Sequence, residues 1–397
     1  MKAIVLGMGQ QGRAVIHDLE QSKIIRQIFA ADIFESDTSL THGNDYLNKM
    51  GYSKTRTIRL DILKEKDLAG KFLRLDLNVV ICMLPIELAL TAARAALDAG
   101  IPFVSSNYTY DLKVLDDLAR EKGVIILPEM GLDPGIDLVM GRLAIDELDE
   151  VHGLYSYGGG VPAPECADNS PIKYKISWIF DRVLAVYVRE GRLIKNGKLH
   201  IVPGNEIFRE ENIHEIEFSG IGAVEAYPNG DSERYVEIFG LGKELVEMGR
   251  FALRWPGHSR FWRTMVDLGL LEDNTVKINN ADISPRAFLT NWLTPRLQFG
   301  KTERDLALLR VEAWGIKKGK KVKITYDLLD YRDLETGLFA MNRTVGFTSS
   351  IGALMILEGK ITQPGVLSPV KHVPPLEFIE EIKKRGIMMD HRIEELD

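Results

Sequence analysis

A glycine-rich motif at the start of the chain constrains the fold more than any other feature. The apolar run AIVL (3–6) leads directly into Gly7-x-Gly9-x-x-Gly12, and a helical pattern follows. In this context Gly7 permits a tight turn, Gly9 lets the backbone approach a pyrophosphate, and Gly12 lets helix and strand pack closely. The free N–H groups of the helix N-terminus then favour phosphate binding. The loop residues expected to hold a dinucleotide are Gly7, Gly9, Gln10, Gln11 and Gly12.

The end of the next apolar run suggests which dinucleotide is bound. The segment QIFAAD ends at Asp32, 20 residues after Gly12. A carboxylate at this position accepts hydrogen bonds from the ribose hydroxyls and repels a 2′-phosphate. Ile33 follows, where an NADP enzyme can supply an arginine. We therefore expect NAD, with NADP the less favoured cofactor.

The same alternation of strands and helices continues to residue 127. Apolar strand patterns occur at 55–61, 77–85, 102–108 and 124–127, with helical patterns at 62–72, 87–98 and 112–122. This order predicts an α/β fold with a doubly wound parallel sheet, whose ligands lie at the carboxyl ends of the strands. Leu84 and Pro85 end one of these strands and are expected on the nicotinamide side of the cofactor.

The junction PEMGLDPGID (128–137) follows the last of these strands. Asp133 suits a helix N-cap and Pro134 suits the first helical position. Capping does not explain the flanking Gly131 and Gly135, which let a backbone approach something bulky. We therefore favour a ligand-facing loop over a simple cap, with Leu132 and Gly135 near the cofactor.

The second half of the chain has a different pattern. Alternating apolar and polar residues at 152–159, 214–239, 306–315 and 320–330 predict an antiparallel sheet with helices, an α+β arrangement. Two short segments have the composition of hairpin turns: Asn-Gly at 229–230 and KKGKK at 317–321. We interpret the lysine-rich turn KKGKK as solvated protection of a sheet edge rather than an anion site.

Long motifs in this chain resemble the saccharopine dehydrogenase family, in its glutamate-forming branch. They are GLDPGID, YGGGVPAPECADN (157–169), YKISW (174–178), AYPNGDSERY (226–235) and ALRWPGH (252–258). The resemblance implies an NAD(P)-dependent oxidoreductase that acts on a C–N bond of a lysine-derived amino acid, by hydride transfer through an imine. It also implies a dinucleotide domain (1–131) completed by a return segment (343–397), and a substrate-binding and dimerisation domain (132–342).

Two alternatives stay open. The segments IKNGK (194–198) and 330–347 resemble lysine 6-dehydrogenases, which deaminate the lysine ε-amine. Gly158 stands where the glutamate-forming branch usually has cysteine, and Gly230 where it usually has a carboxylate-binding arginine. The second alternative is a dinucleotide-sensing protein without turnover.

The resemblance and the residue chemistry together select the candidate substrate groups. Asn107 and Tyr108 match the family's Ser-Tyr substrate position, and Asp133 can hold a substrate amine or accept its proton. Lys175 and Arg254 are cations suited to carboxylates, and arginine binds them by a bidentate fork. The candidate catalytic residues are Asp133, Tyr108 and Lys175; the candidate substrate-binding residues are Asn107, Tyr108, Glu165, Asn169 and Arg254.

Composition excludes several other classes of protein. Apolar residues make up 45% and charged residues 27% of the 397 residues, and the net charge of −7 argues against a nucleic-acid partner. No apolar run approaches the length of a membrane helix, and no pair of the eight histidines has metal-ligand spacing. Two cysteines and the absence of a signal-peptide pattern favour the cytoplasm. We expect a homodimer with a small amino-acid substrate and no metal.

Overall fold

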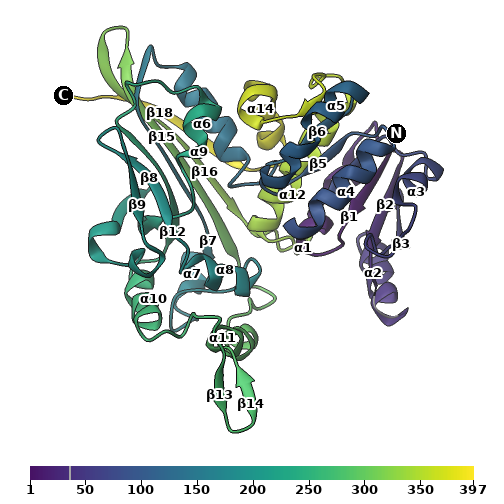
Figure 1. Ribbon diagram of the computed structural model, residues 1–397, viewed down its shortest axis with the longest axis horizontal. Helices are drawn as coiled ribbons and strands as arrows, with labels where there is room; N and C mark the ends of the chain where they lie inside the picture. The colour runs from purple at the N-terminus through teal and green to yellow at the C-terminus, as the bar shows by residue number, and fades with distance from the viewer. Residues whose placement is uncertain (35–36) are drawn as a thin grey trace. The chain divides into compact units, whose positions relative to one another are not determined.

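The computed structural model describes residues 1–34 and 37–397. Within these residues the chain forms two compact units, which we treat separately (Figure 1). The first unit comprises residues 1–139 and 342–387, and the second comprises residues 140–341 and 388–397. The divisions fall inside α6 (Ile136–Asp146), inside α12 (Ala340–Leu357) and at the start of β18 (Met388–Glu395).

The first unit is built on a seven-stranded parallel sheet with the order β17-β6-β5-β4-β1-β2-β3. Its strands are β1 (Lys2–Leu6), β2 (Gln27–Asp32), β3 (Thr55–Arg59), β4 (Val79–Cys82), β5 (Phe103–Ser105), β6 (Ile125–Leu127) and β17 (Gly365–Val366). The register places Leu6 beside Ala31 on one side and Cys82 on the other. The predicted α/β fold with a doubly wound parallel sheet is therefore confirmed.

Both faces of this sheet are covered, as its nearly continuous apolar strands require. Ile4 and Leu6 belong to a buried cluster with residues of α3, α4 and α5. The alternate residue Val5 faces Gly12 of α1, and α1 in turn packs against Gly346 of α12. The helices of this unit are α1 (Gln10–Gln21), α2 (Asp37–Lys49), α3 (Leu68–Arg74), α4 (Ile86–Asp98), α5 (Asp116–Lys122), α13 (Pro369–His372), α14 (Pro375–Lys384) and parts of α6 and α12.

One of these helices is shorter than its pattern predicted. We expected a helix over 62–72, but α3 begins at Leu68. The reason is a cap, because the side chain of Asp67 accepts a hydrogen bond from the Gly70 N–H at 2.9 Å. Residues 62–66 precede that cap in turns.

The second unit contains a nine-stranded sheet whose main path is β10-β11-β12-β7-β15-β16-β18, with β8 and β9 branching from β12. The strands are β7 (Glu150–Pro162), β8 (Gly191–Lys195), β9 (Lys198–Val202), β10 (His214–Phe218), β11 (Gly222–Pro228), β12 (Glu247–Arg254), β15 (Asp305–Lys317), β16 (Lys320–Tyr331) and β18. The prediction of an antiparallel sheet is wrong for β7 and β12, which run parallel with Met248 beside Leu154. An alternating pattern distinguishes the two faces of a strand but carries no information about its direction.

The two predicted hairpins have different outcomes. Lys317 pairs with Lys320, and the turn residues Lys318 and Gly319 both have positive φ, so the lysine-rich hairpin is confirmed. The predicted hairpin at 229–230 is wrong. The carbonyl of Gly230 and the N–H of Ser232 bond instead to Arg192 of β8, and the chain continues into α9 (Arg234–Phe239).

Helices cover the second sheet around an aromatic core. Buried residues of α8, α10 and α11, including Phe180, Trp262 and Leu289, join Tyr157 and Leu308 of the sheet. The remaining helices of this unit are α7 (Pro164–Ala167), α8 (Phe180–Val186), α10 (His258–Asp267) and α11 (Pro285–Leu293). A small separate hairpin consists of β13 (Val276–Ile278) and β14 (Ala281–Ile283).

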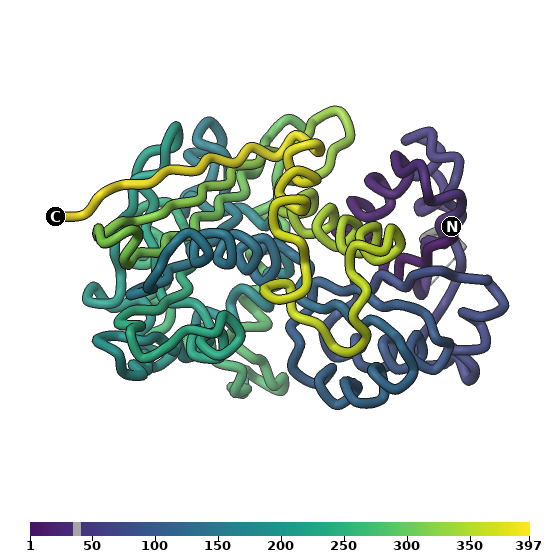
Figure 2. The backbone as a smooth tube through the Cα atoms, turned by 90° about the horizontal axis from the view of Figure 1, so that it is seen from above, coloured from purple at the N-terminus to yellow at the C-terminus, as the bar shows by residue number. Residues whose placement is uncertain are grey.

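The end of the chain differs from the expected return segment 343–397. Residues up to 387 belong to the first unit, where β17 extends the parallel sheet beside β6. Residues 388–395 form β18 and pair with β16 of the second sheet, placing Ile393 beside Ile324. Figure 2 shows this last strand in yellow, running beside the green strands of the second unit. The compact units separate at 139–140. The domain boundary expected at 131–132 therefore stays a prediction.

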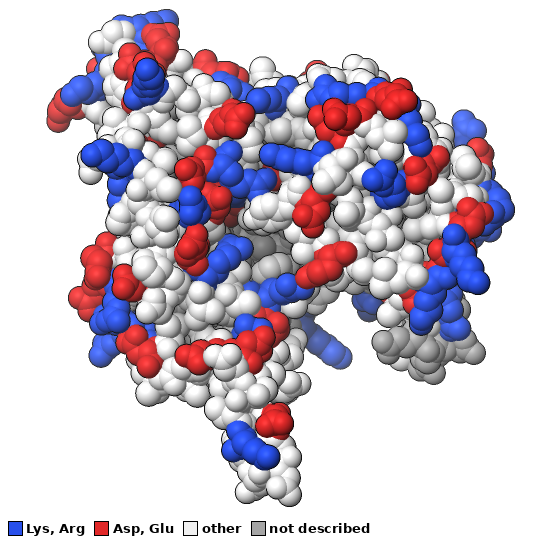
Figure 3. Space-filling model, in the orientation of Figure 1, with Lys and Arg blue, Asp and Glu red and all other residues white. Residues whose placement is uncertain are grey.

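The surface carries both signs of charge. Lysine and arginine are interspersed with aspartate and glutamate over the face drawn in Figure 3. None of the helices in the described ranges combines the length and hydropathy that a bilayer crossing requires. Over the same ranges, no cluster of three or more His, Cys, Asp or Glu residues is arranged to hold a metal ion.

Candidate dinucleotide and substrate sites

The glycine-rich loop of the first unit has the geometry of a phosphate cradle. A Cβ at Gly12 would lie 1.8 Å from the carbonyl oxygen of Gly7, and Gly7 has a φ of +95°, so both positions require glycine for the fold. A Cβ at Gly9 would meet nothing within 4 Å. The helix α1 begins at Gln10 without a side-chain cap or an acidic residue in its first turn, which suits the binding of a pyrophosphate at its N-terminus.

Asp32 lies at the end of β2, beside this loop. Its Oδ2 accepts a hydrogen bond from the Met8 N–H at 2.7 Å, and its Oδ1 accepts one from the Ile33 N–H at 2.8 Å. The carboxylate is thus fixed next to the turn that would hold the phosphates. This arrangement fits the adenosine ribose of a dinucleotide.

The next strand ends bring several predicted residues together. Asn107 donates from Nδ2 to the carbonyl oxygen of Leu84 at 3.1 Å, which links the loops after β5 and β4. Leu84 also lies against Gly7, since its Cδ2 would be 3.2 Å from a Cβ there. Pro85 precedes the first residue of α4. The loops after β1, β4 and β5 therefore form one continuous edge, as predicted for the cofactor side.

The loop after β6 is bonded to the loop after β5. The N–H of Glu129 donates to the Asn107 carbonyl at 2.9 Å, and the N–H of Met130 donates to the Ser105 carbonyl at 2.9 Å. The side chain of Glu129 also accepts a hydrogen bond from the Thr109 N–H at 3.2 Å. The loops after β5 and β6 are consequently joined by these three hydrogen bonds.

The capping interpretation of Asp133 and Pro134 is wrong. The helix α6 begins at Ile136, and the Asp133–Pro134 peptide is cis. The N–H of Gly131 donates to the Pro134 carbonyl at 3.0 Å, and the N–H of Ile136 donates to the Gly131 carbonyl at 2.9 Å. The loop therefore closes on its own backbone before the helix starts.

The same closure explains the two glycines. A Cβ at Gly135 would lie 2.1 Å from the carbonyl oxygen of Gly131, so the closure of the loop by itself requires glycine at position 135. Leu132 is buried, and the carboxylate of Asp137 accepts from the Gly135 N–H at 2.7 Å. Asp133 is partly exposed at this closed loop.

Sequence reasoning missed Glu129 at this edge. Its side chain is fully buried, and its backbone has a φ of +61°. The only sequence sign is an acidic residue between the apolar strand VIIL and the first glycine of the junction.

In the second unit, two predicted residues meet at an acid that was not predicted. Lys175 Nζ lies 2.8 Å from Glu303 Oε2, and Asn169 Nδ2 donates to Glu303 Oε1 at 2.9 Å. Burial disfavours the charged carboxyl, but hydrogen bonds from the Gly300 N–H, Lys175 and Asn169 outweigh it and lower the pKa of Glu303 to about 2. The positive charge of Lys175 is therefore already matched. Glu165 is exposed on α7.

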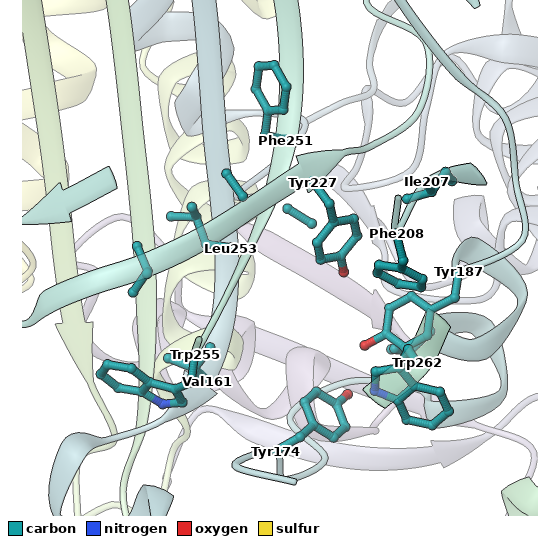
Figure 4. Close-up of a cluster of buried hydrophobic side chains, with 14 of the residues drawn as sticks. Val161, Tyr174, Tyr187, Ile207, Phe208, Tyr227, Phe251, Leu253, Trp255 and Trp262 are labelled. Carbon is teal, nitrogen blue, oxygen red and sulfur yellow. The ribbon is translucent and has the colours of Figure 1, made fainter. Parts of the chain in front are cut away.

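Arg254, the last residue of β12, has different surroundings. It lies over the ring of Tyr174 at 5.5 Å, and Tyr187 and Tyr227 are the other phenols that act on its charge. Figure 4 shows the hydroxyl groups of these three tyrosines directed toward one region inside the buried cluster. Burial opposes the charged guanidinium, but the phenols outweigh it and raise the pKa of Arg254.

We define the tyrosine box as Arg254 with Tyr174, Tyr187 and Tyr227, and the Tyr187 phenol is hydrogen-bonded to Arg254. Within the described chain no carboxylate forms a salt bridge with Arg254, whose N–H groups have the Leu253 carbonyl as an acceptor at 2.7 Å. Its buried Nε and the buried Nε1 of Trp262 have no hydrogen-bond partner there. Tyr187 shares a 2.8 Å hydrogen bond with His258, whose pKa is held well below its ordinary value by burial and by Arg254. The box can accept an anionic group.

Comparison with known proteins identifies the family. Residues 3–127 match the model of the saccharopine dehydrogenase NADP binding domain, and residues 131–387 match that of the saccharopine dehydrogenase C-terminal domain. The chain belongs to the saccharopine dehydrogenase family. The two matches follow each other along the sequence and cover nearly all of it.

Individual relatives agree with this assignment. The chain is 26% identical to the mitochondrial alpha-aminoadipic semialdehyde synthase of Rattus norvegicus, over 98% of this chain and 47% of that protein. It thus spans about half the length of the first curated relatives that it matches. It is 28% identical to the NADP(+), L-glutamate-forming saccharopine dehydrogenase of Schizosaccharomyces pombe, over 89% of this chain and 92% of that protein.

The fold has a counterpart among solved structures. The apo saccharopine dehydrogenase (L-Glu forming) of Saccharomyces cerevisiae superimposes with a TM-score of 0.84 and 23% identity, and the match covers 99% of each chain. This similarity establishes that the saccharopine dehydrogenase fold extends over the chain.

Proposed function

We propose that this protein is a nicotinamide-dinucleotide-dependent oxidoreductase that acts on a C–N bond of a lysine-derived amino acid, with saccharopine as the first candidate substrate. The observation that carries the proposal is the open space at Gly9, beside the fixed carboxylate of Asp32, in a chain that matches both saccharopine dehydrogenase domains. The names of the fungal relatives support the same chemistry.

The reaction assigns separate tasks to the cofactor and the protein. A bound oxidised nicotinamide supplies the hydride acceptor, and the protein binds, orients and deprotonates the substrate. In the oxidative direction the amine carbon loses a hydride, its nitrogen loses a proton, and water opens the resulting C=N bond to a carbonyl and an amine. The residues that would hold the dinucleotide are Gly7, Gly9, Gln10, Gln11, Gly12 and Asp32, with Leu84, Pro85, Leu132 and Gly135 along the same strand ends.

Asp133 and Tyr108 are the proposed groups for the substrate nitrogen. Asp133 lies in the closed loop after β6, and Tyr108 follows Asn107 in the loop bonded to it. A carboxylate here can hold an ammonium group and accept its proton, and a phenol can donate a hydrogen bond. For Lys175 we now propose a positioning role through Glu303, because its ammonium group is already paired. Asn169 acts on the same carboxylate, whereas Glu165 stays a substrate-binding candidate from sequence alone.

Arg254 is the proposed carboxylate-binding residue. The tyrosine box offers a buried guanidinium, and its Nε and the Trp262 Nε1 lack acceptors among the described residues. A substrate carboxylate would supply the missing acceptors and would be desolvated at the same time. Charge-assisted hydrogen bonds of this kind contribute about 1.5–3 kcal/mol each.

We propose NAD as the preferred cofactor. Asp32 is the reason, since its fixed carboxylate repels a 2′-phosphate. The family model and the fungal relatives are named for NADP, so the preference needs a direct test. Asp32→Asn keeps an acceptor for the Met8 N–H but removes the charge. We expect wild type to bind NADH more tightly than NADPH in a fluorescence titration, and Asp32→Asn to narrow the difference; a wild-type preference for NADPH would refute the choice.

The proposed setting is a cytoplasmic homodimer. The support is the low cysteine content of the sequence and the expectation of a dimerisation surface in the second unit. Sedimentation analysis of the purified protein would measure the subunit number directly.

One assay separates the proposed function from its alternatives. Saccharopine and lysine would each be tested for amine-dependent reduction of NAD and NADP. We expect turnover with saccharopine. Turnover with lysine alone would identify a lysine 6-dehydrogenase, and dinucleotide binding without turnover of either amine would favour a sensor.

A further inference from the structure

The search for a second anion-binding residue leads to Gly230. Gly230 has a φ of +72°, and a Cβ built there would lie 3.1 Å from a terminal nitrogen, Nη2, of Arg189. The space that a side chain at position 230 would enter first is thus taken by a guanidinium from another segment. A side chain at position 230 would require Arg189 to shift and would be strained by the positive φ.

Among the described residues the guanidinium of Arg189 has no acidic partner, although acids are close in sequence. The one side-chain hydrogen bond recorded for it there is a long contact of 3.4 Å to Asn229 Oδ1. The neighbouring acids are engaged by Arg192, which reaches Glu190, Asp231 and Glu233 at 3.4, 3.8 and 2.6 Å. Arg192 therefore uses these carboxylates, and the charge of Arg189 is left for another anion.

Arg189 also lies close to the tyrosine box. Tyr187 precedes it by two residues, a backbone span of about 7 Å at most. Tyr227 stands two residues before Asn229, and the rings of Tyr187 and Tyr227 are 6.1 Å apart. The segments 187–189 and 227–230 consequently lead from Tyr187 and Tyr227 of the tyrosine box to the exposed Arg189.

We propose that Arg189 is a specificity-determining residue that binds a second carboxylate of the substrate, while Arg254 binds the first. This inference rests on the proposed function and deepens it. Two cations without acidic partners fit an amine that carries more than one carboxylate, such as saccharopine. Lysine has a single carboxylate and would leave Arg189 without a ligand. Arg189 thus supplies the cation that Gly230 lacks.

The test measures binding as well as turnover. Arg189→Ala should weaken saccharopine binding in isothermal titration by about 10- to 100-fold, the value of a charge-assisted pair, with kcat nearly unchanged. Lysine binding should change less than about 3-fold, since lysine has no carboxylate for this position. Lys198→Ala, which removes an exposed charge on β9, serves as the matched control and should alter neither ligand.

A relocated charge gives the second arm. The double variant Arg189→Gly with Gly230→Arg should recover part of the saccharopine affinity. In this variant position 230, instead of position 189, supplies a guanidinium to the same space. If Arg189→Ala lowers the affinity for saccharopine and for lysine equally, or lowers neither, the proposal is wrong and Arg189 is a solvated surface arginine. Absence of saccharopine binding by wild type overturns the inference. Binding without turnover would instead overturn the proposed oxidoreductase function and leave the Arg189 result intact.

Discussion

Lys175 and Glu303 form an ion pair, with Nζ and Oε2 separated by 2.8 Å and both side chains largely shielded from water. From the sequence, Lys175 was a candidate cation for a substrate carboxylate. Its partner is 128 residues away in sequence, and Asn169 bonds to the same acid. The pair therefore fixes the segment YKISW to the chain that precedes β15.

Lys175→Met should act mainly on stability. The variant leaves Glu303 without its ammonium partner, which should cost about 1–3 kcal/mol of unfolding free energy. Activity per folded molecule should stay within about 10-fold, below the loss expected for an acid–base residue. Urea unfolding and kcat/KM measure the two effects. The double variant Lys175→Met with Glu303→Gln should recover part of the stability. A large loss of kcat in a stable double variant would instead indicate that Lys175 has a catalytic role.

Asp133→Asn tests the proposed role at the substrate nitrogen. Because Asp133 is not the helix cap, the exchange should change stability by less than about 1 kcal/mol. Loss of the charge should lower kcat/KM by about 10² or more. Asp137→Asn removes a charge from the first turn of α6, beside the same loop, and is the matched control. An equal loss of activity in both variants would point to general charge effects rather than to Asp133.

The two central glycines of the nucleotide loop should separate folding from binding. Gly9→Ala places a methyl group in open space, so stability should stay within about 0.5 kcal/mol while dinucleotide affinity falls. Gly12→Ala forces a Cβ to within 1.8 Å of the Gly7 carbonyl and should destabilise the first unit strongly. Thermal melts and dinucleotide titrations of both variants would show the contrast. Unchanged affinity in Gly9→Ala would mean that the cradle does not receive the phosphates.

Asp305 should make stability depend on pH. Burial raises its pKa to about 7 from an ordinary value of 3.8, although the N–H groups of Ala340 and Met341 bond to the carboxylate. Between those values the unfolded chain releases a proton that the folded chain retains, so rising pH lowers the stability. Relative to Asp305→Asn, wild type should lose stability from about pH 4 to about pH 7 and change little below that range. Urea unfolding of both proteins at several pH values would test this, and a difference that is independent of pH would contradict it.

The first unit was predictable because its rules are local. A continuous apolar strand, a glycine turn and a helix recur, and each strand end is marked by residues such as Asp32 or Pro85. In the second unit the direction and pairing of the strands depend on contacts between distant segments, which the sequence pattern does not show. Nothing in the β7 and β12 patterns reveals that they run parallel, and the Asn229–Gly230 pair has turn composition without a returning strand.

The candidate site divides in the same way. The nucleotide loop follows from spacing, since Gly7 and Gly12 must touch whatever the ligand. Tyr187, Trp262 and Glu303 were missed because each is defined by a partner far along the chain. The composition of the junction after β6 was ambiguous. Asp, Pro and Gly suit a helix cap, but in the structure they form a loop that closes where Gly131 and Gly135 meet.

The last strand has a consequence for the order in which the protein folds during synthesis. The parallel sheet needs β17 and the second sheet needs β18, and both come from the final part of the described chain. After residues 305–331 have been synthesised and before β18 follows, β16 has its partner β15 on one side and an unpaired backbone edge on the other. A nascent chain therefore carries an open edge, which is prone to pairing with other chains, until residues 388–395 have left the exit tunnel.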